Sequence, residues 1–407
     1  MTSSFKGLLL TDLIESNSFY QAFQEITEKT DRFPLLIKLS DEDNGELALD
    51  KLVFDSSTKS FSRVRHSYCE NSIYAILFEE MRYFGSGYSM YSNHMILDSL
   101  SPSFVGTNNI DANGIYSDCN LLRSNTKMDV IASNYLDSLP DHFLDPRRSY
   151  ILPFGRLCHN FAHWHLNCLT SIYLGRKYFP EALFITPPLS GWQKDSLDLF
   201  GLYDEEAFIS VDPLLAGGCV VPNAIIFSTS FPWKGLKHAN LLASIFSSLA
   251  ASISQLSRQD YAIEDSPRKI YLSRRSETKH KLFNESEVED EFRCHGFTIL
   301  EPQKVPYKQM AYMIANANYL AGPNGAALIR GAMCNHEASI IQLCFEGSPD
   351  YWLHKHYSFS GVHKSYVYLE GKDSVVRNNS YDPSVFWNME GWTINLDSLR
   401  CFLREIV

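Results

Sequence analysis

KIYLSRR at residues 269–275 opens the stretch that decides the fold, and AGPNGAALIRG at residues 321–331 lies near its end. Within this stretch, short apolar runs with strand character alternate with helical patterns. The expected strands are residues 269–273, 297–300, 318–321 and 339–343. Such alternation predicts a parallel sheet covered by helices.

Two unusual loops follow strands of this predicted sheet. Arg274 and Arg275 come directly after the first strand, and a Gly-Pro-Asn-Gly turn at residues 322–325 follows the third and opens a helix. Parallel sheets bind ligands at the carboxyl ends of their strands. Guanidinium groups and the N-terminus of a helix both bind phosphates. The sequence therefore predicts a diphosphate site at this edge, although a solvated arginine loop and a plain tight turn are alternatives.

The length of 407 residues predicts two domains, because one core rarely serves so long a chain. The first is expected over residues 1–235, with a β-rich start and a Rossmann-like part from about residue 151. The second, also Rossmann-like, is expected over 236–380, with a tail and helix at 381–407. In the first domain, strands are expected at 182–185, 207–211 and 224–228, and the whole predicts an α/β protein with a cleft between two domains.

Composition excludes several classes of protein. A net charge of -11 argues against a nucleic-acid partner. The nine cysteines are scattered without a C-x-x-C pair, so reduced core thiols are expected, and no zinc site. No signal peptide or bilayer-spanning stretch is found, which predicts a cytoplasmic protein, peripheral to the inner membrane at most through its acceptor.

The region before residue 100 contains one ambiguous motif. The apolar run at 33–39 is followed by acids that include Asp41 and Asp43, a D-x-D pattern that could hold a metal and a nucleotide. An acidic turn closed by Asn44-Gly45 is the favoured interpretation. Between residues 82 and 97, Tyr and Met alternate with Gly and Ser, which is typical of twisted hairpins.

A dense polar cluster begins an apolar helical pattern that continues to Tyr178. Within nine residues it contains three histidines and two asparagines, namely His159, Asn160, His163, His165 and Asn167. Capping or core positions are the alternative for these histidines, but so dense a set of polar groups favours a part in the active site.

The motifs of residues 150–345 together resemble glycosyltransferase family 61. The resemblance is carried by His163-Trp164, Tyr271-Leu272-Ser273-Arg274-Arg275, Asn284-Glu285, Gly296-Phe297, Gln309 and Gly322-Pro323-x-Gly325-Ala326-x-Leu328. It implies a GT-B type fold of two Rossmann-like domains. It also implies a nucleotide-sugar donor, most often UDP-linked, inversion at the anomeric carbon, and no essential metal or other cofactor.

An inverting transfer needs a base beside the acceptor hydroxyl and cations or N–H donors at the leaving diphosphate. We expect His163, and next His165, to act as the base, with Asn160, Trp164 and Asn167 binding sugar or acceptor. The expected donor site consists of Arg274, Arg275, Lys281, Asn324, Gly325, Ala326 and Glu346. The predicted partners are a UDP-sugar and a glycan acceptor, with a lipid-linked glycan as one option.

The sequence departs from the family pattern at four of these places. Members commonly carry Asp where Asn167 stands, His at Asn324, Arg at Lys281 and Glu at Gln342. Because Asn167 cannot accept a proton, either a neighbouring histidine is the base or the fold only binds its ligand. A helical start places His163 and Asn167 on one face, and Glu346 is a candidate replacement for the carboxylate missing at 342.

The predicted function is thus an inverting, metal-independent glycosyltransferase of bacterial surface-polysaccharide synthesis. A catalytically degenerate sugar-nucleotide or glycan-binding protein is the first alternative, and a metal-dependent transferase using Asp41 and Asp43 is the second. A dinucleotide oxidoreductase is poorly supported, because no G-x-G-x-x-G follows a strand.

Overall fold

A computed structural model describes much of the chain. The described residues are 8–9, 34–40, 49–66, 73–83, 88–91, 94–97, 144–153, 158–210, 219–227, seven positions between 241 and 253, 266–277, 281–335, 337–345, 364–371, 375–377 and 389–407. Asp41, Asp43 and Glu346 lie outside these ranges. By its contacts the chain divides into two compact units, each of which is described by itself.

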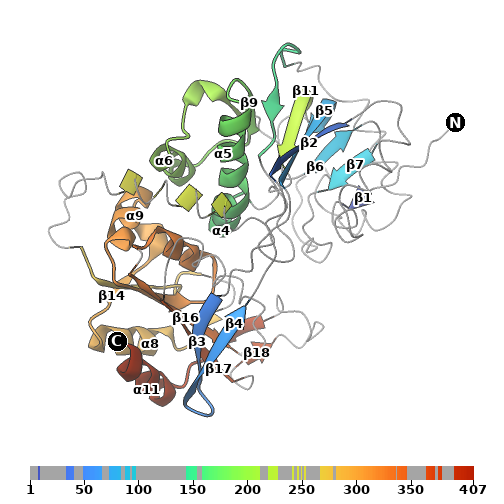
Figure 1. Cartoon of the computed structure of the whole chain (residues 1–407). Helices are drawn as coiled ribbons and strands as arrows, with labels where there is room; N and C mark the ends of the chain where they lie inside the picture. Colours follow the sequence, from blue (N-terminus) through green and yellow to red (C-terminus); the bar gives the residue numbers. More distant parts are fainter. Residues whose placement is uncertain are drawn as a thin grey trace, which may run out of the picture. The chain divides into compact units, whose positions relative to one another are not determined.

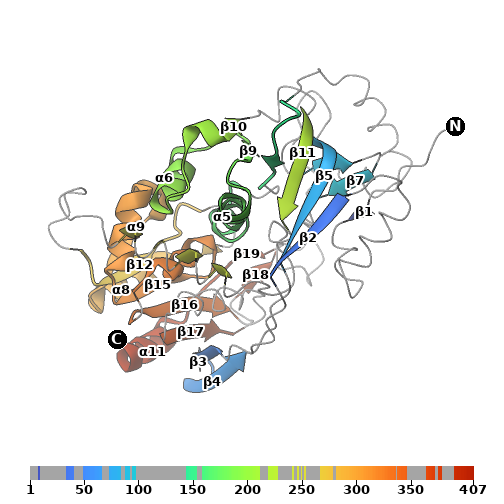
Figure 2. The same cartoon turned by 45° about the horizontal axis from the view of Figure 1, so that its top comes forward.

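The second unit is built on a mostly parallel sheet of seven strands (Figures 1 and 2). Its order is β14 (Thr298–Leu300), β12 (Lys269–Leu272), β15 (Tyr319–Pro323), β16 (Ser339–Phe345), β17 (Lys364–Glu370), β3 (Leu49–Asp55) and β4 (Ser60–His66). All neighbours are parallel except the β3–β4 hairpin. The four strands predicted between residues 269 and 345 are confirmed, with ends shifted by one or two residues.

Helices cover both faces of this sheet (Figure 1). The helix α9 (Tyr307–Ala315) lies on one side, and α8 (Glu285–Cys294) and α11 (Leu396–Ile406) lie on the other. The predicted C-terminal helix is confirmed as α11, which is capped by the Asn395 side chain accepting from the Ser398 N–H. The segment after the Gly-Pro-Asn-Gly turn forms a 3₁₀ helix, η8 (Ala326–Met333), and a shorter one, η7, spans Pro302–Lys304.

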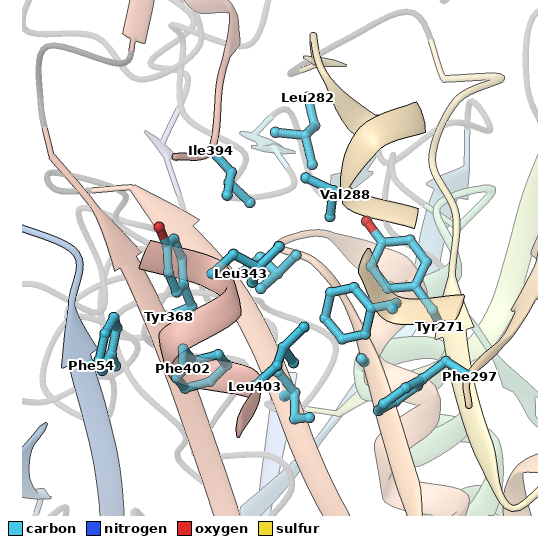
Figure 3. Close-up of a cluster of buried hydrophobic side chains, with 14 of the residues drawn as sticks. Phe54, Tyr271, Leu282, Val288, Phe297, Leu343, Tyr368, Ile394, Phe402 and Leu403 are labelled. Atoms are coloured by element: carbon cyan, nitrogen blue, oxygen red, sulfur yellow. The ribbon is translucent and has the colours of Figure 1, made fainter. Parts of the chain in front are cut away.

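The main core of this unit lies between the sheet and the helices α8 and α11 (Figure 3). Val288 and Phe292 of α8 and Phe402 of α11 pack there on side chains from alternate positions of the strands, including Tyr271 and Tyr368. Residues at the intervening positions, such as Val53, Cys344 and Val367, form a separate cluster on the opposite face. A period of two along every strand therefore gives the sheet two apolar faces, as a helix-covered parallel sheet requires.

Residues from the start of the chain complete this second sheet. The β3 strand pairs in parallel with β17 through four residue pairs, from Leu52 with Tyr366 to Asp55 with Leu369. Residues 43–70 and 192–201 belong to the second unit, together with residues 235–407. The change of unit between Lys234 and Gly235 lies next to the expected boundary at 235, whereas residues 43–70 and 192–201 were expected in the first domain. Hairpin periodicity in residues 49–66 says nothing about which sheet the hairpin joins, since pairing partners are set by distant contacts.

The first unit contains a mixed sheet of nine strands. Four are parallel: β11 (Cys219–Phe227), β8 (Tyr150–Ile151), β9 (Leu183–Thr186) and β10 (Phe208–Ser210). On the other side of β11, the sheet continues through antiparallel β5 (Ile73–Tyr83), which also pairs with β2 (Pro34–Ser40). The β6–β7 hairpin (Tyr88–Tyr91 and His94–Leu97) and β1 (Leu8–Leu9) complete it, which confirms the predicted hairpin character of 82–97.

The helical pattern that ends at Tyr178 is confirmed in three connected pieces. They are α4 (Phe161–His163), a π-helical turn η3 (Trp164–Cys168) and α5 (Leu169–Tyr178). Two helices follow, α6 (Gly191–Leu199) and the 3₁₀ turn η4 (Glu205–Ala207).

A small third sheet joins β13 (Lys281–Leu282), β19 (Met389–Trp392) and β18 (Val375–Arg377). Among the described residues, no helix is long and apolar enough to cross a membrane.

Candidate active site

The carboxyl ends of β12 and β15 are joined by the Arg274 side chain. Its Nη1 donates to the backbone oxygen of Asn324, directly after β15. The guanidinium lies against Gly325, where an added Cβ would come within 2.7 Å of Arg274 Cζ. Gly325 also has a φ of 159°, which L side chains rarely adopt. Because glycine has no Cβ, Gly325 leaves room for the guanidinium of Arg274, which follows the neighbouring strand β12.

Glu285, the first residue of α8, holds the backbone of this arginine loop. Its Oε1 accepts the Arg274 N–H at 2.7 Å and lies 3.4 Å from the donating Tyr271 hydroxyl. The residue is only 3% exposed. Burial raises the pKa of Glu285 from 4.5 to about 7, against the opposing effect of the Arg274 N–H, and Glu289 raises it further.

Arg275 is anchored to a second buried acid of the same helix. Its Nε lies 3.1 Å from Glu289 Oε1, and Arg293 Nη2 lies 3.1 Å from Glu289 Oε2. The Glu289 side chain is fully buried, whereas that of Arg275 is about half exposed (48%). Glu289 thus holds the Arg275 guanidinium in place, while about half of the arginine side chain remains exposed to solvent.

Asn324 is tied to the adjacent strand by two further hydrogen bonds. Its backbone N–H donates to Leu343 O at 2.8 Å, and its Oδ1 accepts from Gln342 Nε2 at 2.7 Å. Two of the four departures from the family pattern therefore contact each other. Both residues are amides, so the pair has a donor and an acceptor for its hydrogen bond and carries no charge.

The turn from β15 into η8 brings the backbone close to β12. A Cβ on Gly322 would lie 2.9 Å from Leu272 O, so glycine permits close packing of the two strand ends. Ala326 and Ala327 begin η8 and are half-buried. The first N–H groups of a helix lack intrahelical acceptors, and an anion can bind to them.

Two other residues of the expected donor site stand differently. Lys281 is exposed on β13, where its backbone pairs with Gly391 of β19. Glu346 lies outside the described residues. Asn284 is structural, because its amide donates to Ile394 O at 2.8 Å and accepts from Ile394 N–H at 3.0 Å.

In the first unit, His163 and Asn167 form a pair. His163 Nδ1 lies 3.2 Å from Asn167 Oδ1, so the prediction that they share a helix face is confirmed. Because an amide oxygen only accepts, this contact assigns the proton to Nδ1 and the lone pair of the neutral ring to Nε2. Burial lowers the pKa of His163, and the Asn167 hydrogen bond opposes this effect. The ring is therefore neutral at pH 7 and suited to accept a proton.

The other predicted residues of this helix start have structural contacts. Asn160 caps the helix, since its Oδ1 accepts from the N–H groups of Ala162 at 2.9 Å and His163 at 3.3 Å. Trp164 is fully buried and so offers no open face to a sugar, contrary to the expectation. His165 is 1% exposed, and its Nδ1 lies 2.7 Å from Phe161 O. Of the two histidines proposed as bases, His163 is the more accessible.

Sequence reasoning gave no role to the two buried glutamates of α8. Glu285, Val288, Glu289 and Phe292 follow the i, i+3, i+4, i+7 pattern and are all buried. Two acids within the apolar stripe of a helix were the available signal, because buried carboxylates need charged or hydrogen-bonding partners. The loop after β12 provides such partners: the Arg274 N–H donates to Glu285, and the Arg275 guanidinium pairs with Glu289.

Comparison with known proteins gives one family. Residues 161–341 match the profile of the family described as Glycosyltransferase 61. The match includes the His163–Asn167 pair, the arginine loop, both buried glutamates and the Asn324 turn. No curated protein matches the chain. The resemblance seen in the sequence motifs is confirmed over residues 161–341, whose match to glycosyltransferase family 61 indicates a glycosyltransferase.

Proposed function

We propose that the protein is an inverting, metal-independent glycosyltransferase that moves a sugar from a nucleotide sugar, UDP-linked by preference, to a glycan acceptor. The observation that carries the proposal is the Arg274 guanidinium held over Gly325, at the carboxyl ends of β12 and β15. This is the edge where parallel sheets bind ligands. The cation lies in the region matched by the transferase family.

In this proposal the second unit binds the donor diphosphate. Arg274 and Arg275 neutralise the charge that develops on the leaving group, and the first N–H groups of η8, at Ala326 and Ala327, donate to phosphate oxygens. The amide pair of Asn324 and Gln342 fixes the turn that carries these N–H groups. Guanidinium groups thereby supply the positive charge that other transferases take from a metal ion.

His163 is the proposed general base. An acceptor hydroxyl loses its proton to His163 Nε2 as its oxygen attacks the anomeric carbon, opposite the departing diphosphate. Asn167 keeps the proton on Nδ1 by accepting from it. The asparagine therefore takes the orienting part of an aspartate without its charge. Asn167→Asp should raise the pKa of His163 and move the acid limb of the pH–rate profile to higher pH.

Nucleotide binding tests the donor site. We expect UDP to bind with equal affinity in the presence and absence of EDTA. Arg274→Ala should weaken binding by roughly 1.5 to 3 kcal/mol through loss of a charge-assisted hydrogen bond. Arg147→Ala is the control, since Arg147 is exposed and pairs only with nearby Asp145 among its described contacts. Equal affinity of the Arg274 variant and the wild type would exclude this site.

The missing aspartate at position 167 keeps a second function open, that of a sugar-nucleotide or glycan-binding protein without turnover. His163→Ala separates the two. For a transferase, turnover should fall while donor affinity stays nearly constant, whereas a binding protein shows no transfer in either form. Loss of UDP binding on chelation would instead favour the third candidate, a metal-dependent enzyme using Asp41 and Asp43.

The wider setting is also proposed. The two units would form a GT-B type enzyme, with the acceptor bound by the first and the donor by the second. A bacterial surface polysaccharide is the proposed product, and the cytoplasm, where nucleotide sugars are made, is the proposed location. Glu346 and Lys281 complete the proposed donor site, and transfer assays with their alanine variants test that assignment.

A further inference from the structure

Glu285 is a buried carboxylate in contact with the loop that presents Arg274. It lies at the start of α8, against the end of β12, and accepts the Arg274 N–H at 2.7 Å. The hydroxyl of Tyr271, the penultimate residue of that strand, lies 3.4 Å from the same oxygen. These two neutral donors provide weak compensation for a buried charge.

The charges that act on Glu285 come from few elements. Arg274 attracts a negative charge at this position, whereas Glu289, one helical turn along α8, repels it. Glu289 in turn is paired with Arg275 and Arg293. On the neighbouring elements, Arg400 of α11 pairs with Glu291 and Asp397, and Glu301 after β14 pairs with Lys304.

Arg274 is therefore the cation that favours the ionised form of Glu285. A diphosphate bound to Arg274 places negative charge on the far side of that guanidinium. The same arginine would then face a ligand anion as well as the carboxylate, and the carboxylate would feel a new repulsion. Among the described residues, Arg274 is the one cation that acts on Glu285, so no second positive charge there offsets the ligand anion.

We infer that Glu285 is a positioning residue that couples donor binding to proton uptake: it holds the Arg274 loop as a carboxylate and takes up a proton when a nucleoside diphosphate occupies Arg274. The inference rests on the proposed function, because it needs a diphosphate at that arginine. It adds a residue that touches neither sugar nor phosphate and acts through Arg274.

The sign of the effect follows from linkage. The pKa of Glu285 is already raised to about 7 by burial, so both forms exist near neutral pH. Binding raises the pKa again and therefore favours the protonated form. Donor affinity should be constant below the pKa of the free protein and fall as the pH rises above it. The fall is about tenfold for each unit by which binding raises that pKa.

Calorimetric titration in two buffers with different enthalpies of ionisation measures the uptake directly. UDP-glucose is the probe, because its diphosphate is esterified at both ends and has no group that titrates near pH 7. In the wild type the observed heat should differ between the buffers near pH 7, as uptake of a fraction of a proton requires. In Glu285→Gln, which keeps an oxygen to accept the Arg274 N–H, the heat should be equal in both buffers.

Two further variants sharpen the assignment. Glu289→Gln removes the repelling charge, so maximum uptake should move to lower pH. Glu291→Gln makes the same chemical change on the same helix, at a residue paired with Arg400 of α11, and should leave the uptake unchanged. Uptake that persists in Glu285→Gln would assign it to another group and overturn the inference.

The outcome also separates this inference from the proposed function. Binding of UDP-glucose with equal heats in both buffers would refute proton coupling and leave the donor site standing. Absence of binding to the wild type by UDP-glucose and by UDP would refute both. A change of donor KM with pH in the wild type, absent from Glu285→Gln at constant kcat, is the expected kinetic counterpart.

Discussion

Two buried carboxylates of the second unit lie at strand ends of the same sheet, and their surroundings differ. Glu370, the last residue of β17, is 8% exposed and accepts four hydrogen bonds: Ser56 Oγ at 2.6 Å, Asn395 N at 2.7 Å, Tyr368 OH at 2.8 Å and Gly371 N at 3.2 Å. Glu285, near the end of β12, is 3% exposed and accepts the Arg274 N–H and a longer contact from Tyr271.

The difference separates a structural carboxylate from one that is ready to titrate. Four donors to Glu370 tie β17 to the end of β3 through Ser56 and to the start of α11 through Asn395, so these hydrogen bonds stabilise the fold. At Glu285 too few donors offset burial, and the raised pKa measures that deficit. The same residue type thus holds three elements together at one strand end and remains poised for a proton at another.

Glu370→Gln should give the largest effect. An amide places an NH₂ where one carboxylate oxygen accepted, so two buried donors lose their acceptor. We expect a loss of roughly 3 to 5 kcal/mol in the free energy of unfolding. Urea unfolding monitored by tryptophan fluorescence measures it. Asp145→Asn, at a partly exposed acid that pairs with the exposed Arg147, should change the free energy of unfolding little.

Glu285→Gln should have the opposite sign. The folded pKa of Glu285, about 7, lies above its ordinary 4.5, so the folded state binds the proton more tightly. The stability from this group is complete below about pH 4.5 and is lost as the pH rises through 7. A neutral glutamine avoids that loss, so the variant should exceed the wild type by roughly 2 to 3 kcal/mol at pH 8.

The pH dependence contains its own control. Well below pH 4.5 the wild-type carboxyl is protonated in both states, and the two proteins should have nearly equal free energies of unfolding. The measured quantity is the difference in free energy of unfolding between Glu285→Gln and the wild type. The same difference at pH 5 and at pH 8 would contradict the comparison between the two glutamates.

Much of the second sheet was predictable, because its apolar runs are short, regular and separated by helical patterns. The strands β12, β14, β15 and β16 and the helix α11 follow from local periodicity. The addition of β3 and β4 to the same sheet was not predictable. The pairing of β3 with β17 joins residues more than 300 positions apart, and nothing local to residues 49–66 encodes that partner.

The site was predictable where position along a strand implies place. Arg274, Asn324 and Gly325 meet because β12 and β15 are parallel neighbours whose carboxyl ends share an edge. The His163–Asn167 contact follows from helical spacing. The fate of Trp164 was not predictable, because burial depends on the packing of the whole unit. The Asn324–Gln342 hydrogen bond also needs the register of β15 on β16, which sequence alone does not fix.

Gly325→Ala tests whether Arg274, rather than Glu285 alone, sets the donor site. The new methyl would collide with the guanidinium and displace it from Asn324. We expect donor affinity to fall by about tenfold, or roughly 1.4 kcal/mol, since one charge-assisted contact is misplaced. Gly371→Ala is the matched control, because a Cβ there meets nothing within 4 Å. Equal UDP affinities of the two variants by titration would exclude a role for Arg274 at this position.

The smallest change in free energy is expected for the hydrogen bond between Asn324 and Gln342. It is a useful reference because it should not depend on pH. Asn324→Ala, Gln342→Met and the double variant form a cycle whose coupling free energy should be about 1 kcal/mol, typical of a neutral hydrogen bond. Neither amide titrates, so this coupling measured by urea unfolding should be the same at pH 5 and pH 8. The contribution of Glu285 to the free energy of unfolding should change over that interval.

A coupling free energy that varied with pH would show that the charge of Glu285 affects the pair through Arg274, which contacts both Asn324 and the Glu285 carboxylate. The turn and the arginine loop would then respond as one element to the proton.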